Sequence, residues 1–166
     1  MKYAHALKFS AAVLLLAFAA VGFADSRDWS LTDTQGETFK LSEVQADAPT
    51  MLIFWATWCA PCKKELNDNQ KLFQSYEDKG MRVILIAEDN LKTQAKVKPY
   101  VESKGYKWRV LLDPNGEVLK RYGGTSIPYT VLIDKDGKSV QQYRGEARNT
   151  SELTKQVDAL LGGKGE

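Results

Sequence analysis

The sequence predicts an α/β fold in which a mixed central sheet is flanked by helices. Two continuous apolar runs, PTMLIFWAT at 49–57 and MRVILIAED at 81–89, indicate strands that are buried on both faces. Each run leads into a segment with helical patterning, and this alternation favours parallel pairing of the two strands. Two β-hairpin patterns, at 29–44 and 129–145, would add antiparallel strands.

The first half of the chain provides a hairpin, a buried strand and a helix. The segment WSLTDTQGETFKLSEV alternates in polarity and turns at Gln35-Gly36. After the first buried strand, apolar residues recur at helical spacing from about Ala60, and Lys79-Gly80 ends the segment. The residues on the apolar face of this predicted helix are Leu66, Leu72, Phe73 and Tyr76.

The middle of the chain is less clearly patterned. The segment 91–106 has a helical composition but contains Pro99, so the helix either kinks there or begins near Lys98. The segment KWRVLLD at 107–113 alternates like a strand. A turn and a short helix are expected within PNGEVLKRYGG at 114–124.

A hairpin and a helix close the chain. The hairpin at 129–145 turns at Asp136-Gly137. Asn149 can cap the last helix, with Glu152 three residues later as in a capping box, and Gly162-Gly163 ends it. The core-facing residues of this helix are Leu153, Val157, Leu160 and Leu161.

The N-terminus has the three-part pattern of a secretory signal. Lys2 and Lys8 give a positive start, the apolar run AAVLLLAFAAV follows, and small residues precede a cut after Ala24. The apolar run is shorter than the roughly 20 residues that a membrane-spanning helix needs. We therefore expect residues 1–24 to be a signal peptide and residues 25–166 to form one domain in the periplasm or another extracytoplasmic compartment.

The charge of the chain argues against a nucleic-acid partner. The 166 residues include 23 Lys and Arg against 21 Asp and Glu, and signal cleavage would remove Lys2 and Lys8 but no acid. The expected mature chain is therefore close to neutral, whereas nucleic-acid surfaces need clustered basic residues. Cleavage would also remove His5, the single histidine, which excludes the commonest general base and metal ligand.

The only two cysteines, Cys59 and Cys62, lie within WATWCAPCKKE and allow three interpretations. A structural zinc site needs four Cys or His ligands, and these are the only two that the mature chain would offer. A structural disulfide is ordinary in an exported protein, but closing so short a loop removes little chain entropy. The third interpretation is a redox pair.

The placement of the pair favours redox chemistry. It follows a buried strand and opens a helix, so that Cys59 would lie at the helix N-terminus, where free N–H groups and the helix dipole stabilise an anion. That environment lowers the pKa of a thiol, and the thiolate is the nucleophile. Cys62 would follow one turn later on the same face, and Pro61 is tolerated in the first turn.

The segment FWATWCAPCKKEL resembles the active site of thioredoxin-fold oxidoreductases. More narrowly, the chain is similar to the exported TlpA/ResA-like thiol–disulfide oxidoreductases, which include reductants used in cytochrome c maturation. The N-terminal hairpin, the W-C-x-x-C motif, an extra β–α segment at 81–106 and SIPYTVLIDKDGK stand in the order of that family. The resemblance implies a thioredoxin fold with an N-terminal β-hairpin and a central β–α insertion.

The same resemblance implies roles for individual residues. Cys59 matches the exposed attacking cysteine and Cys62 the buried resolving one. Pro128 matches a cis-proline beside the disulfide, and the preceding peptide at Ile127 would offer backbone groups to an extended substrate. The substrate-binding residues expected on this basis are Trp58, Ala60, Pro61, Ile127 and Pro128.

Proton transfer at the sulfurs needs an acid, and the sequence offers two. Glu65 matches an acid that some relatives carry three residues after the second cysteine; its charge would oppose thiolate formation and it could pass protons. The alternative is a solvated carboxylate favoured by the helix dipole. Ile53 stands where cytoplasmic thioredoxins carry a buried acid, so Glu88 at the end of the second strand is the other candidate.

Together these features predict an enzyme that reduces disulfides in a client protein. The cysteine pair is the redox group, so that no organic cofactor and no metal are required, and a membrane thiol donor would supply electrons. The reducing direction follows from the resemblance alone. Two alternatives stay open at this point: an oxidase or isomerase for folding proteins, and a non-catalytic binding module with an inert disulfide.

Overall fold

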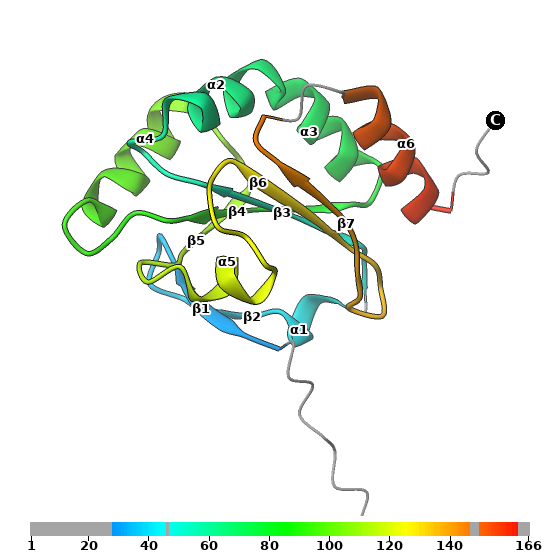
Figure 1. The fold of residues 1–166 in the computed structure, drawn as a ribbon, viewed down its shortest axis with the longest axis horizontal. Coiled ribbons are helices and arrows are strands. Elements are labelled where there is room, and N and C mark those ends of the chain that lie inside the picture. The colour runs from blue at the N-terminus through cyan, green and yellow to red at the C-terminus, as the bar shows by residue number, and fades with distance from the viewer. Residues whose placement is uncertain (1–27, 46, 147–149, 163–166) are drawn as a thin grey trace, which may run out of the picture.

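The computed structural model describes residues 28–45, 47–146 and 150–162 (Figure 1). The expected signal peptide, the expected cap Asn149 and the expected helix end at Gly163 lie outside the described residues. Within those described ranges, no helix is long and apolar enough to cross a membrane.

A seven-stranded mixed sheet forms the centre of the fold (Figure 1). Its strand order is β2-β1-β5-β4-β3-β6-β7. The pairs β3–β4 and β4–β5 are parallel, and the remaining pairs are antiparallel, which confirms the predicted mixed sheet. The strands are β1 (Ser30–Asp33), β2 (Thr38–Lys40), β3 (Thr50–Trp55), β4 (Arg82–Ala87), β5 (Arg109–Leu112), β6 (Tyr129–Ile133) and β7 (Ser139–Arg144).

Helices cover both faces of this sheet (Figure 1). Four lie on one face, and their inward side chains share one buried cluster with Met51, Ile53 and Leu85 of the central strands. These are α2 (Ala60–Asp68), α3 (Gln70–Asp78), α4 (Val97–Lys104) and α6 (Thr150–Leu160). The short helix α5 (Glu117–Arg121) lies on the other face, where Leu52 and Phe54 belong to a second buried cluster that Phe39 of the N-terminal hairpin joins.

The predicted helix from Ala60 to Lys79 is interrupted, which the sequence pattern did not indicate. Asn69 stands between α2 and α3 with φ −102° and ψ 10°, and both its backbone N–H and its side-chain amide donate to the carbonyl of Glu65. The apolar spacing continues through this break because Leu66, Phe73 and Tyr76 still face the same cluster. The break turns the helix without exposing its apolar face.

Other boundaries settle points that the sequence left open. A short 3₁₀ turn (Gln94–Lys96) precedes α4, which begins at Val97, so that Pro99 lies in the first turn and causes no kink. A further helix, α1 (Ser42–Gln45), follows the first hairpin and was not predicted. Both predicted hairpins are present, and the glycines of their turns, Gly36 and Gly137, have φ of 88° and 78°.

Candidate active site

The two cysteines lie where β3 passes into α2. Cys59 is the N-cap residue of α2, with extended backbone angles, and Pro61 stands in the first turn of the helix. The loop between the two elements is closed by a hydrogen bond from the Cys59 N–H to the Ala56 carbonyl at 3.1 Å. The placement at a helix N-terminus is the one that the sequence predicted.

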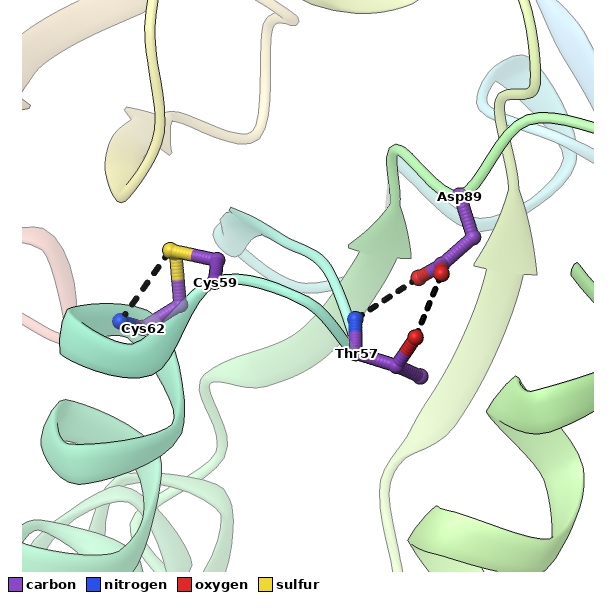
Figure 2. Close-up of a disulfide and its surroundings, with 4 residues drawn as sticks. All are labelled: Thr57, Cys59, Cys62 and Asp89. Carbon is purple, nitrogen blue, oxygen red and sulfur yellow. Dashed lines mark hydrogen bonds between the residues drawn. A yellow bond between two sulfur atoms is a disulfide. The ribbon is translucent and has the colours of Figure 1, made fainter. Parts of the chain in front are cut away.

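Cys59 and Cys62 form a disulfide with a Cα–Cα distance of 5.3 Å (Figure 2). The backbone N–H of Cys62 donates to the Sγ of Cys59 at 3.2 Å. In the reduced protein the same donor can stabilise negative charge on this sulfur, which together with the helix dipole lowers the pKa of a thiol. The geometry therefore favours Cys59 as the thiolate.

The exposure of the two cysteines is unequal but small. Cys59 is 5% exposed and Cys62 is fully buried. The prediction of an exposed Cys59 is therefore wrong for the disulfide state, in which Cys59 belongs to the same buried cluster as Cys62. The flanking residues Trp58, Ala60 and Pro61 are exposed, and Trp58 presents 59% of its surface.

The loop before β6 lies at the same end of the sheet. The peptide between Ile127 and Pro128 is cis. In the antiparallel pairing of β3 and β6, Phe54 is opposite Tyr129, so Pro128 adjoins the end of β3 from which the cysteine loop departs. Ile127 is half-buried and packs against both buried clusters, including the one that contains the two cysteines.

Glu65 is buried, so the alternative of a solvated carboxylate is wrong. It is 4% exposed and shares the buried face of α2 with Cys62 and Leu66. The neighbouring lysines are occupied elsewhere: Lys64 donates to Asp68 at 2.5 Å, and the Lys63 ammonium lies 5.8 Å from the ring centroid of Tyr100. The acid, and not the lysines, points into the protein near the cysteine pair.

Glu88 lies on the face of the sheet opposite to the buried cluster that contains Cys59 and Cys62. Along β4, Ile84 and Ile86 face the cluster under α5, and Glu88 continues their alternation. Burial and the carboxylate of Asp113 raise the pKa of Glu88 to about 9. Asp113 itself accepts backbone hydrogen bonds at the start of α5. Glu88 therefore interacts with Asp113 at the start of α5 and not with the cysteines. Of the two candidate acids, Glu65 is better placed to exchange protons with the cysteine pair.

Sequence reasoning missed a contact between the cysteine loop and the end of β4. The buried carboxylate of Asp89 accepts two hydrogen bonds from Thr57, one from the backbone N–H at 2.8 Å and one from Oγ1 at 2.5 Å (Figure 2). The sequence around Asp89 gives no sign of this contact, because Asp89 is one of 21 acidic residues and no local pattern distinguishes it. Only the pairing of β3 with β4 brings residues 32 positions apart together.

The residues around the pair do not form a metal site. Among the residues that the structure describes, no group of three or more His, Cys, Asp or Glu side chains could hold a metal ion. The sulfurs are bonded to each other, and the backbone N–H of Cys62 donates a hydrogen bond to the Sγ of Cys59. The bond between these two sulfurs is the one that dithiol–disulfide exchange opens and closes.

Comparison with known proteins agrees with this chemistry. The model of the AhpC/TSA family matches residues 24–142. The thiol–disulfide oxidoreductase ResA of Bacillus thuringiensis subsp. konkukian is 33% identical over 156 residues, covering 84% of this chain and 88% of the relative. The ResA of Geobacillus kaustophilus is 28% identical and covers 87% and 91%.

The chain belongs to the AhpC/TSA family.

Within the AhpC/TSA family, this chain is a thiol–disulfide oxidoreductase with a thioredoxin-like fold. The exposed lipoprotein thioredoxin of Streptococcus pneumoniae is 30% identical with a TM-score of 0.67, covering 80% of this chain and 99% of that one. A protein from Chlorobium tepidum described as the thiol:disulfide interchange protein DsbE is 27% identical with a TM-score of 0.69, covering 81% and 94%. These likenesses confirm the predicted fold class.

Proposed function

We propose that this oxidoreductase reduces disulfides in a client protein outside the cytoplasm. The observation that carries the exchange chemistry is the asymmetry of the pair, and the reducing direction is proposed from the resemblance to ResA-like proteins. Cys59 is the helix cap and its sulfur accepts the Cys62 N–H, whereas Cys62 is fully buried in the first turn. A sulfur that is stabilised as an anion suits attack, and a buried neighbour suits resolution.

The reaction then proceeds in two exchanges. The Cys59 thiolate attacks one sulfur of the client disulfide, forms a mixed disulfide and releases the other client sulfur as a thiolate. Cys62 loses its proton and attacks the Sγ of Cys59, which releases the second client sulfur. The client gains two electrons, and its two thiolates take up two protons, one given up by Cys62 and one from solvent, which had received the proton of Cys59 when that thiol ionised. The enzyme is left with the disulfide seen in the structure. A membrane thiol donor would reduce it again.

The proposed client groove lies between the exposed loop and the cis-proline loop. Trp58, Ala60 and Pro61 would contact the client from one side, and Ile127 and Pro128 from the other. The pairing of β3 with β6, which brings both loops to one end of the sheet, supports this assignment. Glu65 would exchange the proton of Cys62 because it shares the buried face of α2 with that residue.

The proposed location is the periplasm or another extracytoplasmic compartment. Residues 1–24 would be removed as a signal and residues 25–166 would form the thioredoxin-like domain. The pneumococcal relative is described as an exposed lipoprotein, and the sequence of the first 24 residues has the pattern of an export signal. Reduction of a client in cytochrome c maturation is the pathway that the resemblance to TlpA/ResA-like proteins suggests.

The reduction potential of the pair tests the proposed direction. The protein is equilibrated with graded ratios of reduced and oxidised dithiothreitol, quenched with an alkylating agent and analysed by mass spectrometry. A potential near that of thioredoxin (about −270 mV) or lower agrees with a reductant. A potential near that of a strong periplasmic oxidant (about −120 mV) would assign the enzyme to disulfide formation instead. Failure to exchange at all would indicate an inert disulfide.

A further inference from the structure

We infer that Asp89 is a positioning residue of this enzyme, which holds the loop before Cys59 so that Trp58 and Cys59 are presented to an extended client segment. The inference rests on the proposed function, because it concerns how that site meets its client. Its basis is the pair of hydrogen bonds between Asp89 and Thr57 (Figure 2).

The contact lies where backbone pairing between the β3 and β4 segments ends. The last ladder bond at this edge runs from the Glu88 N–H to the Trp55 carbonyl at 2.8 Å. Beyond it, the backbone N–H of Thr57 has no strand to pair with, and the Asp89 side chain accepts it instead. Asp89 is fully buried, so its carboxylate is held by the surrounding structure and can act as a fixed anchor.

The residue after Thr57 needs such an anchor. Trp58 is 59% exposed, so that packing contributes little to the direction of its side chain. Its orientation therefore depends on the backbone of the loop, whose remaining internal bond joins Cys59 to Ala56. Fixing Thr57 at both its N–H and its hydroxyl removes rotational freedom directly before Trp58, which lowers the entropy cost of docking a client.

Two substitutions separate the parts of this contact. Thr57→Val keeps the shape of the side chain and the backbone bond but removes the hydroxyl. Asp89→Asn leaves one acceptor oxygen for two donors. Thr57→Ser restores the hydroxyl and serves as the rescue variant. The matched control is Asp134→Asn, because Asp134 also accepts two bonds in a turn, from the N–H groups of Asp136 and Lys138, but lies at the opposite end of β6 from Pro128.

Each reduced variant is mixed with two probes: a synthetic extended peptide with one internal disulfide, and the small disulfide 5,5′-dithiobis(2-nitrobenzoate). A hydrogen bond to a charged group changes an equilibrium constant by on the order of tenfold. We therefore expect Thr57→Val and Asp89→Asn to slow the peptide reaction about tenfold. The small probe should change less than about twofold, and Thr57→Ser and Asp134→Asn should match the wild type on both probes.

The inference is overturned if the peptide rates of Thr57→Val and Asp89→Asn stay at the wild-type value while only their thermal stability falls. It is equally overturned if the reactions with both probes slow by the same factor. The contact would then change the reactivity of the Cys59 sulfur and not the way in which the loop is presented to a client. Circular dichroism confirms that the rates are those of folded protein. Should the wild type itself react with neither probe, the proposed function would fail, which is a separate result.

Discussion

Glu88 and Asp113 form a carboxyl pair at the end of the sheet that carries the active site. Asp113 is 1% exposed and accepts backbone hydrogen bonds from Glu117, Val118 and Leu119, which fixes the start of α5. Glu88 approaches it closely enough to share a hydrogen bond, and its burial raises its pKa to about 9. Glu88 therefore holds a proton at neutral pH.

This pair predicts a pH-dependent stability. The folded pKa of Glu88 is about 9, whereas an unfolded glutamate has a pKa of about 4.3. Between these values the folded state binds a proton that the unfolded state does not, so the contribution of Glu88 is present in full below about pH 4.3 and is lost as the pH rises toward 9. Glu88→Gln should therefore unfold at higher urea concentration than wild type at pH 8, with little difference at pH 4.

The control for this experiment is Glu102→Gln, since Glu102 is exposed on α4. It should follow the wild type at both pH values. If the difference between Glu88→Gln and wild type were the same at pH 4 and pH 8, Glu88 would not be the proton-binding group.

The features that could be predicted from the sequence are those encoded locally. The buried strands β3 and β4 are continuous apolar runs, and the turn glycines Gly36 and Gly137 mark both hairpins. The position of Cys59 at the start of a helix follows from a buried strand that ends shortly before it and from Pro61 shortly after.

The features that could not be predicted depend on the tertiary arrangement. The break at Asn69 carries no glycine or proline, and the helical spacing continues through it. The Asp89–Thr57 contact joins residues that only the parallel pairing of β3 and β4 brings together. The low exposure of Cys59 goes with its place in a buried cluster drawn from several strands and helices, which no local pattern reports.

Glu65→Gln is predicted to change how the thiols ionise. Glu65 is 4% exposed and shares the buried face of α2 with Cys62, and a nearby negative charge opposes thiolate formation. Removing the charge should move the pH midpoint of Cys59 alkylation by iodoacetamide to lower pH, by about one pH unit or less. The same helix supplies the control Asp68→Asn, an exposed acid paired with Lys64, which should leave the midpoint in place.

An unchanged midpoint in Glu65→Gln would mean that the Glu65 carboxylate does not oppose ionisation of Cys59. A midpoint that moved equally in both variants would mean that only the overall charge of α2 matters.

Trp58→Ala is predicted to separate function from stability. The side chain is 59% exposed, so its removal should change the free energy of unfolding by no more than about 0.5 kcal/mol. If Trp58 contacts the client, its truncation should slow reduction of the extended disulfide peptide about tenfold, as for other interface tryptophans. Stopped-flow fluorescence of the peptide reaction measures this rate. Val140→Ala, a 40% exposed residue on β7 next to the pairing of Ser139 with Ile133 and so at the opposite end of β6 from Pro128, should react like wild type, and equal rates for the two variants would exclude Trp58 from the groove.

The central claim is that Cys59 attacks and Cys62 resolves, and capture of the mixed disulfide tests it most directly. Reduced Cys62→Ser and Cys59→Ser variants are each incubated with the disulfide peptide, quenched in acid and digested for mass spectrometry. We predict that Cys62→Ser accumulates a stable adduct on Cys59 and that Cys59→Ser, whose remaining thiol is buried, accumulates none. An adduct on Cys62 in the second variant, or no adduct in the first, would contradict the account.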